Sequence, residues 1–61
     1  MSTKPPTGTQ IRRLRTRKGW TQARLADLIG VTHVTVSNWE RGVFAPNPMA
    51  ARAIRALIQT A

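Results

Sequence analysis

The sequence predicts an all-α protein, a compact bundle of four or five short helices in a single small domain of 61 residues. Three observations support this fold class. Apolar residues recur three and four positions apart in four segments, which is the spacing of one helix face. Each segment follows a threonine or asparagine that can cap a helix, and the first three segments end near a glycine. Hydrophobic residues make up 41 % of the chain, which is enough for a compact core.

Each expected helix has its own start signal. Thr7, with Gln10 three residues later, fits a capping box at the first helix. Thr21 and Thr32 can cap the second and third helices, and Asn47, followed by a proline, can start the fourth. Glycines after the first three helices can take the left-handed conformation that ends a helix. The expected helices span residues 8–18, 22–29, 33–41 and 48–59.

Two segments allow other local interpretations. Residues 1–7 are polar with two prolines, so we expect a flexible arm ahead of a domain over residues 8–61. The third helix contains the β-branched run 34–36, which makes a strand over 31–36 an alternative. We favour the helix because helix signals flank the run on both sides.

The inward-facing apolar positions of the four helices predict the core. The two tryptophans could instead stack on unpaired bases. Core packing is favoured because Trp39 is in helical register with Val36, and Trp20 lies between two helices. The end of the fourth helix, at Leu57 and Ile58, could be left for a dimer partner. The expected core residues are Ile11, Leu14, Trp20, Leu25, Ala26, Ile29, Val31, Val36, Trp39, Ile54 and Leu57.

The charge balance predicts a polyanionic partner. Ten lysines and arginines face two acidic residues, which gives a formal net charge of +8. Nucleic acid is the first candidate and an anionic membrane surface the second. A membrane-active helix is disfavoured because stop signals recur along the chain, and no apolar run approaches the roughly 20 residues of a membrane span. No signal peptide is evident at the N-terminus, so we expect a cytoplasmic protein.

The composition argues against catalysis. The chain has no cysteine, one histidine (His33) and two acidic residues, Asp27 and Glu40. These are too few for most metal sites or acid–base pairs, and no phosphate-binding loop is present. We therefore expect no enzymatic activity, no catalytic residue, no metal site and no cofactor.

Residues 21–42 carry the most informative motif. Two short expected helices are joined by a tight turn at Gly30, which is the layout of a helix-turn-helix. The second helix of this motif enters the DNA major groove, which is about 12 Å wide. Its exposed positions in this chain are small and polar, so the helix can approach base edges closely.

The sequence features that carry a family resemblance are the basic first helix IRRLRTRKG, then Thr21-Gln22, Leu25-Ala26, Gly30-Val31, Thr32-His33, Thr35-Val36-Ser37 and Trp39-Glu40-Arg41-Gly42. With these residues, the chain resembles the phage-repressor type of helix-turn-helix, the Cro and lambda-repressor-like DNA-binding domains, over about residues 8–60. The resemblance implies a sequence-specific regulator of transcription, a small repressor that binds a palindromic operator in double-stranded DNA as a homodimer. It also implies a bacterial or phage origin.

Roles for individual residues follow from the resemblance. It implies a structural ion pair between Arg15 and Glu40. Val34 is expected to contact a thymine methyl group, because valine cannot donate a hydrogen bond. The expected base-reading residues are His33, Val34, Ser37 and Asn38. The expected contacts to the DNA backbone are Thr21, Gln22, Arg24, Thr32, Thr35, Arg41 and Arg12.

Two other functions remain as alternatives. An antitoxin-type or architectural DNA-binding module would take its main specificity from a protein partner, which could bind at the fourth helix. A single-strand or RNA-binding module would need exposed aromatic residues among the basic ones. The chain has three aromatic residues, and two of them are expected to face inward.

Overall fold

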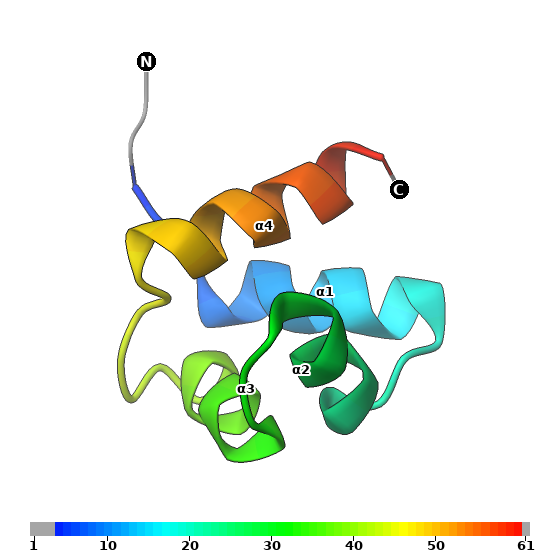
Figure 1. The fold of residues 1–61 in the computed structure, drawn as a ribbon, viewed down its shortest axis with the longest axis horizontal. Helices are drawn as coiled ribbons and strands as arrows, with labels where there is room; N and C mark the ends of the chain where they lie inside the picture. Colours follow the sequence, from blue (N-terminus) through cyan, green and yellow to red (C-terminus); the bar gives the residue numbers. More distant parts are fainter. Residues whose placement is uncertain (1–3, 61) are drawn as a thin grey trace.

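The computed structural model describes residues 4–60, which form four α-helices in the predicted order (Figure 1). The all-α prediction is confirmed, and within residues 4–60 there is neither a strand nor a fifth helix. The expected bounds of the first, second and fourth helices match to the residue. The helices are α1 (Gly8–Lys18), α2 (Gln22–Ile29), α3 (His33–Glu40) and α4 (Pro48–Gln59).

Local hydrogen bonds at the four N-termini explain why the helix starts could be predicted. The Thr7 hydroxyl accepts from the Gln10 N–H at 3.1 Å, and the Thr7 N–H donates to Gln10 Oε1 at 2.9 Å, which completes the capping box. The side chains of Thr21, Thr32 and Asn47 each accept from the backbone N–H three residues later. Each helix start is therefore set by one or two neighbouring side chains.

The end of α3 differs by one residue from the prediction, which placed Arg41 inside the helix. Arg41 is the C-cap, and Gly42 follows with φ +76°. The Gly42 N–H donates to the Trp39 carbonyl at 3.1 Å, and the Val43 N–H donates to the Asn38 carbonyl at 2.9 Å. This paired arrangement of bonds ends the helix before Arg41.

The strand alternative for 31–36 is wrong. Val36 lies within α3 and is fully buried, so its packing in the core outweighs the weak helix propensity of the β-branched run.

The helices pack around one core. α4 packs against α1 and α2, while α3 packs against α2 and α1. Figure 1 shows α4 along one side of the molecule and α3 on the other, with α1 between them. The buried core cluster consists of Ile11, Leu14, Leu25, Ala26, Val36, Trp39, Ala50 and Ile54. Half-buried around it lie Trp20, Ile29, Val31, Leu57 and Ile58.

Gly8 brings the start of α1 against the end of α3. A Cβ atom at this position would lie 2.5 Å from the Trp39 carbonyl oxygen and 2.7 Å from the Glu40 carbonyl oxygen. Both distances are shorter than any side chain could tolerate, so only glycine permits this approach.

Part of the expected flexible arm, residues 1–3, lies outside the described residues. Within the described part, Pro6 is buried, and the Lys4 carbonyl accepts a hydrogen bond from Arg55 Nη1 at 3.3 Å. The segment just before α1 therefore lies against α4 in the structure.

Candidate nucleic-acid interface

The turn between α2 and α3 sets the angle of the helix-turn-helix. Gly30 has φ +92°, a left-handed conformation that side chains other than glycine rarely adopt. The N–H groups of Gly30 and Val31 both donate to the Ala26 carbonyl, at 2.8 and 3.0 Å. Val31 packs half-buried against the core, and Thr32 then caps α3. Backbone bonds and packing together hold the start of α3 against α2.

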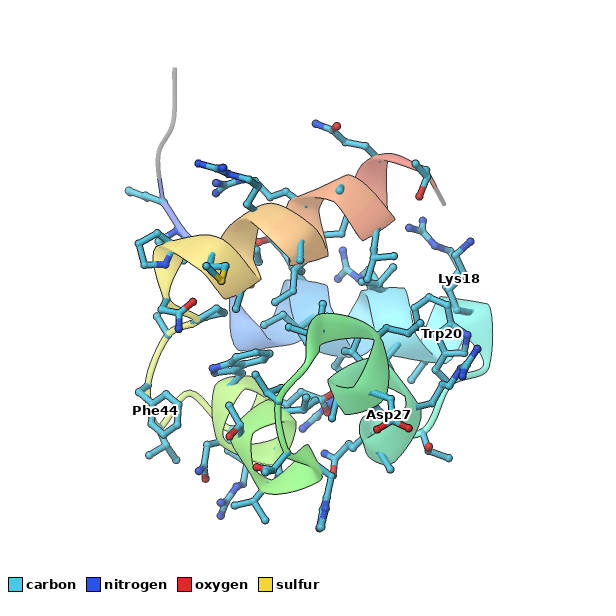
Figure 2. The ribbon with its side chains drawn as sticks, in the orientation of Figure 1. Lys18, Trp20, Asp27 and Phe44 are labelled. Atoms are coloured by element: carbon cyan, nitrogen blue, oxygen red, sulfur yellow. The ribbon has the colours of Figure 1, made fainter. Side chains whose placement is uncertain are left out.

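The inner face of α3 is fixed by burial. The side chains of Val36 and Trp39 belong to the core cluster, and Trp39 is only 3 % exposed. Trp20 is half-buried, with Lys18 Nζ 6.0 Å from its ring centroid (Figure 2). Neither tryptophan exposes its ring fully to solvent, as stacking on unpaired bases would require.

Glu40, at the end of the inner face, ties α3 to both neighbouring helices. Its side chain is 1 % exposed. Arg15 on α1 donates to it twice, from Nε to Oε2 at 2.6 Å and from Nη2 to Oε1 at 3.0 Å. Gln22 Nε2 on α2 donates to Oε1 at 3.3 Å, and Arg12 Nε on α1 donates to the same oxygen at 3.4 Å. One buried carboxylate thus links three helices. We call Glu40, Arg15, Gln22 and Arg12 the Glu40 cluster.

The cluster shifts the pKa values of its two central members. Burial alone would raise the pKa of Glu40, but hydrogen bonds from Arg15, Gln22 and Arg12 and the positive charge of Arg15 outweigh it. The pKa of Glu40 is therefore lowered from its ordinary value. The hydrogen bond to Glu40 raises the pKa of Arg15, against a smaller opposing effect of burial. The carboxylate is thus held ionised inside the protein.

The outer face of α3 carries the expected base-reading residues. His33 and Val34 are exposed, and Ser37 and Asn38 are half-buried. Arg41 follows directly after the helix and is exposed, and its Nη2 donates to Asn38 Oδ1 at 2.7 Å. The structure therefore brings all four expected base-reading residues onto one helix, with their side chains outside the core.

The expected DNA backbone contacts differ in how far they are engaged within the protein. Arg24 and Arg41 are exposed, and Arg41 also donates to Asn38. Gln22 and the exposed Arg12 belong to the Glu40 cluster, and the hydroxyl groups of Thr32 and Thr35 lie 3.0 Å apart at the start of α3. The last of the expected contacts, Thr21, is exposed, and its hydroxyl caps α2.

Sequence reasoning missed three features of this region. Arg12 and Gln22 are expected to contact DNA, and the resemblance also implies that Gln22 braces the third helix. Their hydrogen bonds to Glu40 have no local signal, because the partners lie 28 and 18 residues away. The bond between Asn38 and Arg41 could have been found from their spacing of three on a helix. Phe44, after the end of α3, is 48 % exposed and points away from the helices (Figure 2).

Two further features of the described chain bear on partners. Among residues 4–60, no group of three histidine, cysteine, aspartate or glutamate side chains is arranged to hold a metal ion. None of the four described helices combines the length and apolar character needed to cross a membrane.

The family of the chain follows from its sequence. The model of the family described as Helix-turn-helix matches residues 11–60, which runs from the first turn of α1 to the end of the described chain. No curated protein and no solved structure matches the chain. The family match covers both helices of the motif, the turn at Gly30 and the whole Glu40 cluster. The chain therefore belongs to the Cro/C1-type helix-turn-helix family and is a DNA-binding regulator of transcription.

Proposed function

We propose that the protein is a small repressor that binds a palindromic operator as a homodimer, with α3 in the major groove of each half-site. One observation carries the proposal: α3 has a buried inner face, and its outer face presents the short, uncharged side chains of Val34, Ser37 and Asn38, with Arg41 at the end of the helix. The inner face is held by Val36, Trp39 and Glu40. A rigidly held helix with an unobstructed outer face suits direct contact with base edges.

The distribution of charge supports contact with duplex DNA. The protein carries a formal net charge of +8. Of its two acidic side chains, Glu40 is enclosed by arginines, so its charge is compensated within the protein. Arg24 on α2 and Arg41 after α3 are exposed, and in this proposal both contact phosphates. Each phosphate contact would strengthen binding at low salt and position the helix without selecting a sequence.

A dimer would supply the specificity that a single copy lacks. One α3 helix of eight residues is about 12 Å long and can contact only a few base pairs. Two copies on half-sites one helical turn apart, about 34 Å, would double the number of base contacts. In this proposal the dimer acts by occlusion: it covers the operator and blocks the polymerase. Such a repressor would work in the cytoplasm of a bacterium.

The test is a binding selection on random duplex DNA at about 50 and 200 mM salt, the range over which phosphate contacts weaken strongly. We expect an inverted repeat whose half-sites are centred 10–10.5 base pairs apart, at about one helical turn. The mass of the complex on the selected DNA should correspond to two chains.

The other outcomes are equally informative. A single, unrepeated motif bound by one chain would exclude the dimer and the palindrome but keep base recognition. Binding without any enriched motif, lost steeply as salt rises, would exclude the specific repressor. That result would favour the architectural or antitoxin-type module, whose specificity comes from a protein partner.

A further inference from the structure

Asn38 and Arg41 are joined by a hydrogen bond on the outer face of α3, and the proposed function gives this bond no role. Arg41 Nη2 lies 2.7 Å from Asn38 Oδ1, a short hydrogen bond between residues three positions apart. Val34, Asn38 and Arg41 follow a spacing of four and three along the helix, so they lie on one stripe of the outer face. The contact therefore lies within the surface that we propose to meet the bases.

Arg41 determines which end of the Asn38 amide is available. A guanidinium group only donates hydrogen bonds, so the amide oxygen must be the atom that faces Arg41. Among residues 4–60, the structure gives Asn38 Nδ2 no hydrogen-bond partner, so both of its N–H groups can be donated to DNA. The remaining N–H groups of the guanidinium are also donors. Together, Asn38 and Arg41 present donors to the groove.

The bases differ in how well they match such a surface. Adenine presents one acceptor and one donor in the major groove, and asparagine binds it by using both ends of the amide. Guanine presents two neighbouring acceptors, N7 and O6. A positively charged group beside the amide oxygen also disfavours the amino group of adenine at that oxygen.

No carboxylate on the outer face offsets this preference. Glu40 is the only acidic residue of α3, and its side chain is buried against Arg15. The outer face therefore has no anionic acceptor for the amino group of cytosine or adenine.

We infer that Asn38, with its amide oxygen held by Arg41, acts as a donor that selects a guanine in each half-site. Arg41 is then a specificity-determining residue as well as a phosphate contact. The inference rests on the proposed function, because it names the base pair that the proposed interface selects.

The test compares binding selections for the native protein and three variants, after circular dichroism has shown that each variant is folded. Asn38→Ala removes the amide and identifies the base pair that Asn38 contacts. At that position the native protein should prefer G·C over A·T by about 5- to 150-fold, the range typical of a good two-bond contact. The alanine variant should lose this preference and keep the rest of the motif.

Arg41→Met frees the amide oxygen while keeping the length of the side chain. Asn38 can then bind adenine with both ends of its amide, so the preference at the same position should change from G·C to A·T. Arg24→Met is the matched control, because it also removes one exposed positive charge but lies on α2. It should weaken binding to all sequences alike and leave G·C preferred.

Three results would overturn the inference while the proposed function stands: an A·T pair preferred by the native protein at the Asn38 position, an unchanged G·C preference in Arg41→Met, or an Asn38→Ala motif identical to the native one. A native protein that selects no motif at all would refute the proposed function, and the inference would fail with it. A G·C preference that is lost in Asn38→Ala and changes to A·T in Arg41→Met supports the inference.

Discussion

The inner and outer faces of α3 differ in what holds their side chains in place, although both belong to one helix of eight residues. The inner face is specified by burial and by the Glu40 cluster, so its contacts are complete within the protein. Beyond the start of the helix, the outer face makes one side-chain hydrogen bond within residues 4–60, from Arg41 to Asn38. The packing of the inner face therefore constrains where α3 lies, while Val34, Ser37 and Asn38 on the outer face lie outside the core cluster. Substitutions on the two faces should therefore have separable effects.

The largest expected effect is on the inner face. Trp39→Ala should lower the free energy of unfolding by about 3–5 kcal/mol, because it removes a buried aromatic side chain and leaves a cavity. A domain of 61 residues has only about 3–9 kcal/mol of stability, so the variant should lose a third or more of it and melt at a clearly lower temperature. Thermal melts followed by circular dichroism would measure this. A stable Trp39→Ala protein that had lost only DNA binding would contradict the division between the faces.

The next effect concerns the buried ion pair. Arg15→Met should lower the free energy of unfolding by about 3 kcal/mol, because Glu40 stays buried without its main partner. The loss should not be larger, because Glu40 keeps its hydrogen bonds from Gln22 and Arg12. Urea denaturation of the single and double variants with Glu40→Gln would give the coupling energy. The double variant should recover part of the loss, since it no longer buries a carboxylate that has lost its closest cationic partner. A coupling energy near zero would show that the two side chains stabilise the fold independently.

The pH dependence of stability should come mainly from the inner face. The pKa of Glu40 is lowered in the folded protein, so the unfolded chain takes up the proton first as the pH falls. The stabilisation is complete above the ordinary glutamate pKa of about 4.3, decreases below it, and is lost once the pH has fallen through the folded pKa. Urea denaturation between pH 7 and pH 3 should show this decrease, and Glu40→Gln should flatten it. An equal slope in both proteins would assign the acid sensitivity to another group.

The smallest effect on stability is expected on the outer face. Val34 is 53 % exposed, so Val34→Ala should change the free energy of unfolding by no more than about 0.5 kcal/mol. It should nevertheless weaken the preference for thymine at one position of the selected motif, because the methyl contact is lost. Parallel urea denaturation and binding measurements would separate the two readouts. A loss of stability comparable with that of Arg15→Met would show that the outer face also supports the fold.

The beginnings of the helices could be predicted from the sequence more exactly than the end of α3. Helix starts depend on side chains three residues apart, so Thr7, Thr21, Thr32 and Asn47 could be identified by spacing. The end of α3 was misplaced by one residue, because Arg41 itself has no signal that separates a cap from a last helical turn.

Contacts between distant segments were harder to predict. The meeting of Arg15 and Glu40 was expected from the family resemblance, but the bonds from Gln22 and Arg12 were not. The close approach at Gly8 depends on a carbonyl group more than 30 residues away, and the glycine alone indicates only a permissive backbone. The roles of the outer-face residues remain predictions, since their expected partners lie on DNA.

The Glu40 cluster also sets the smallest piece of this protein that can fold alone. The family motif proper, α2, the turn and α3, contains the carboxylate but neither arginine that neutralises it. A synthetic peptide of residues 21–42 would leave Glu40 without its cationic partners and Trp39 without α1 to cover it. We therefore expect that α3 cannot be transferred to another protein as a two-helix fragment. The smallest unit that folds alone should begin at α1, and a design that transfers the proposed DNA contacts should exchange the outer-face side chains rather than the helix pair.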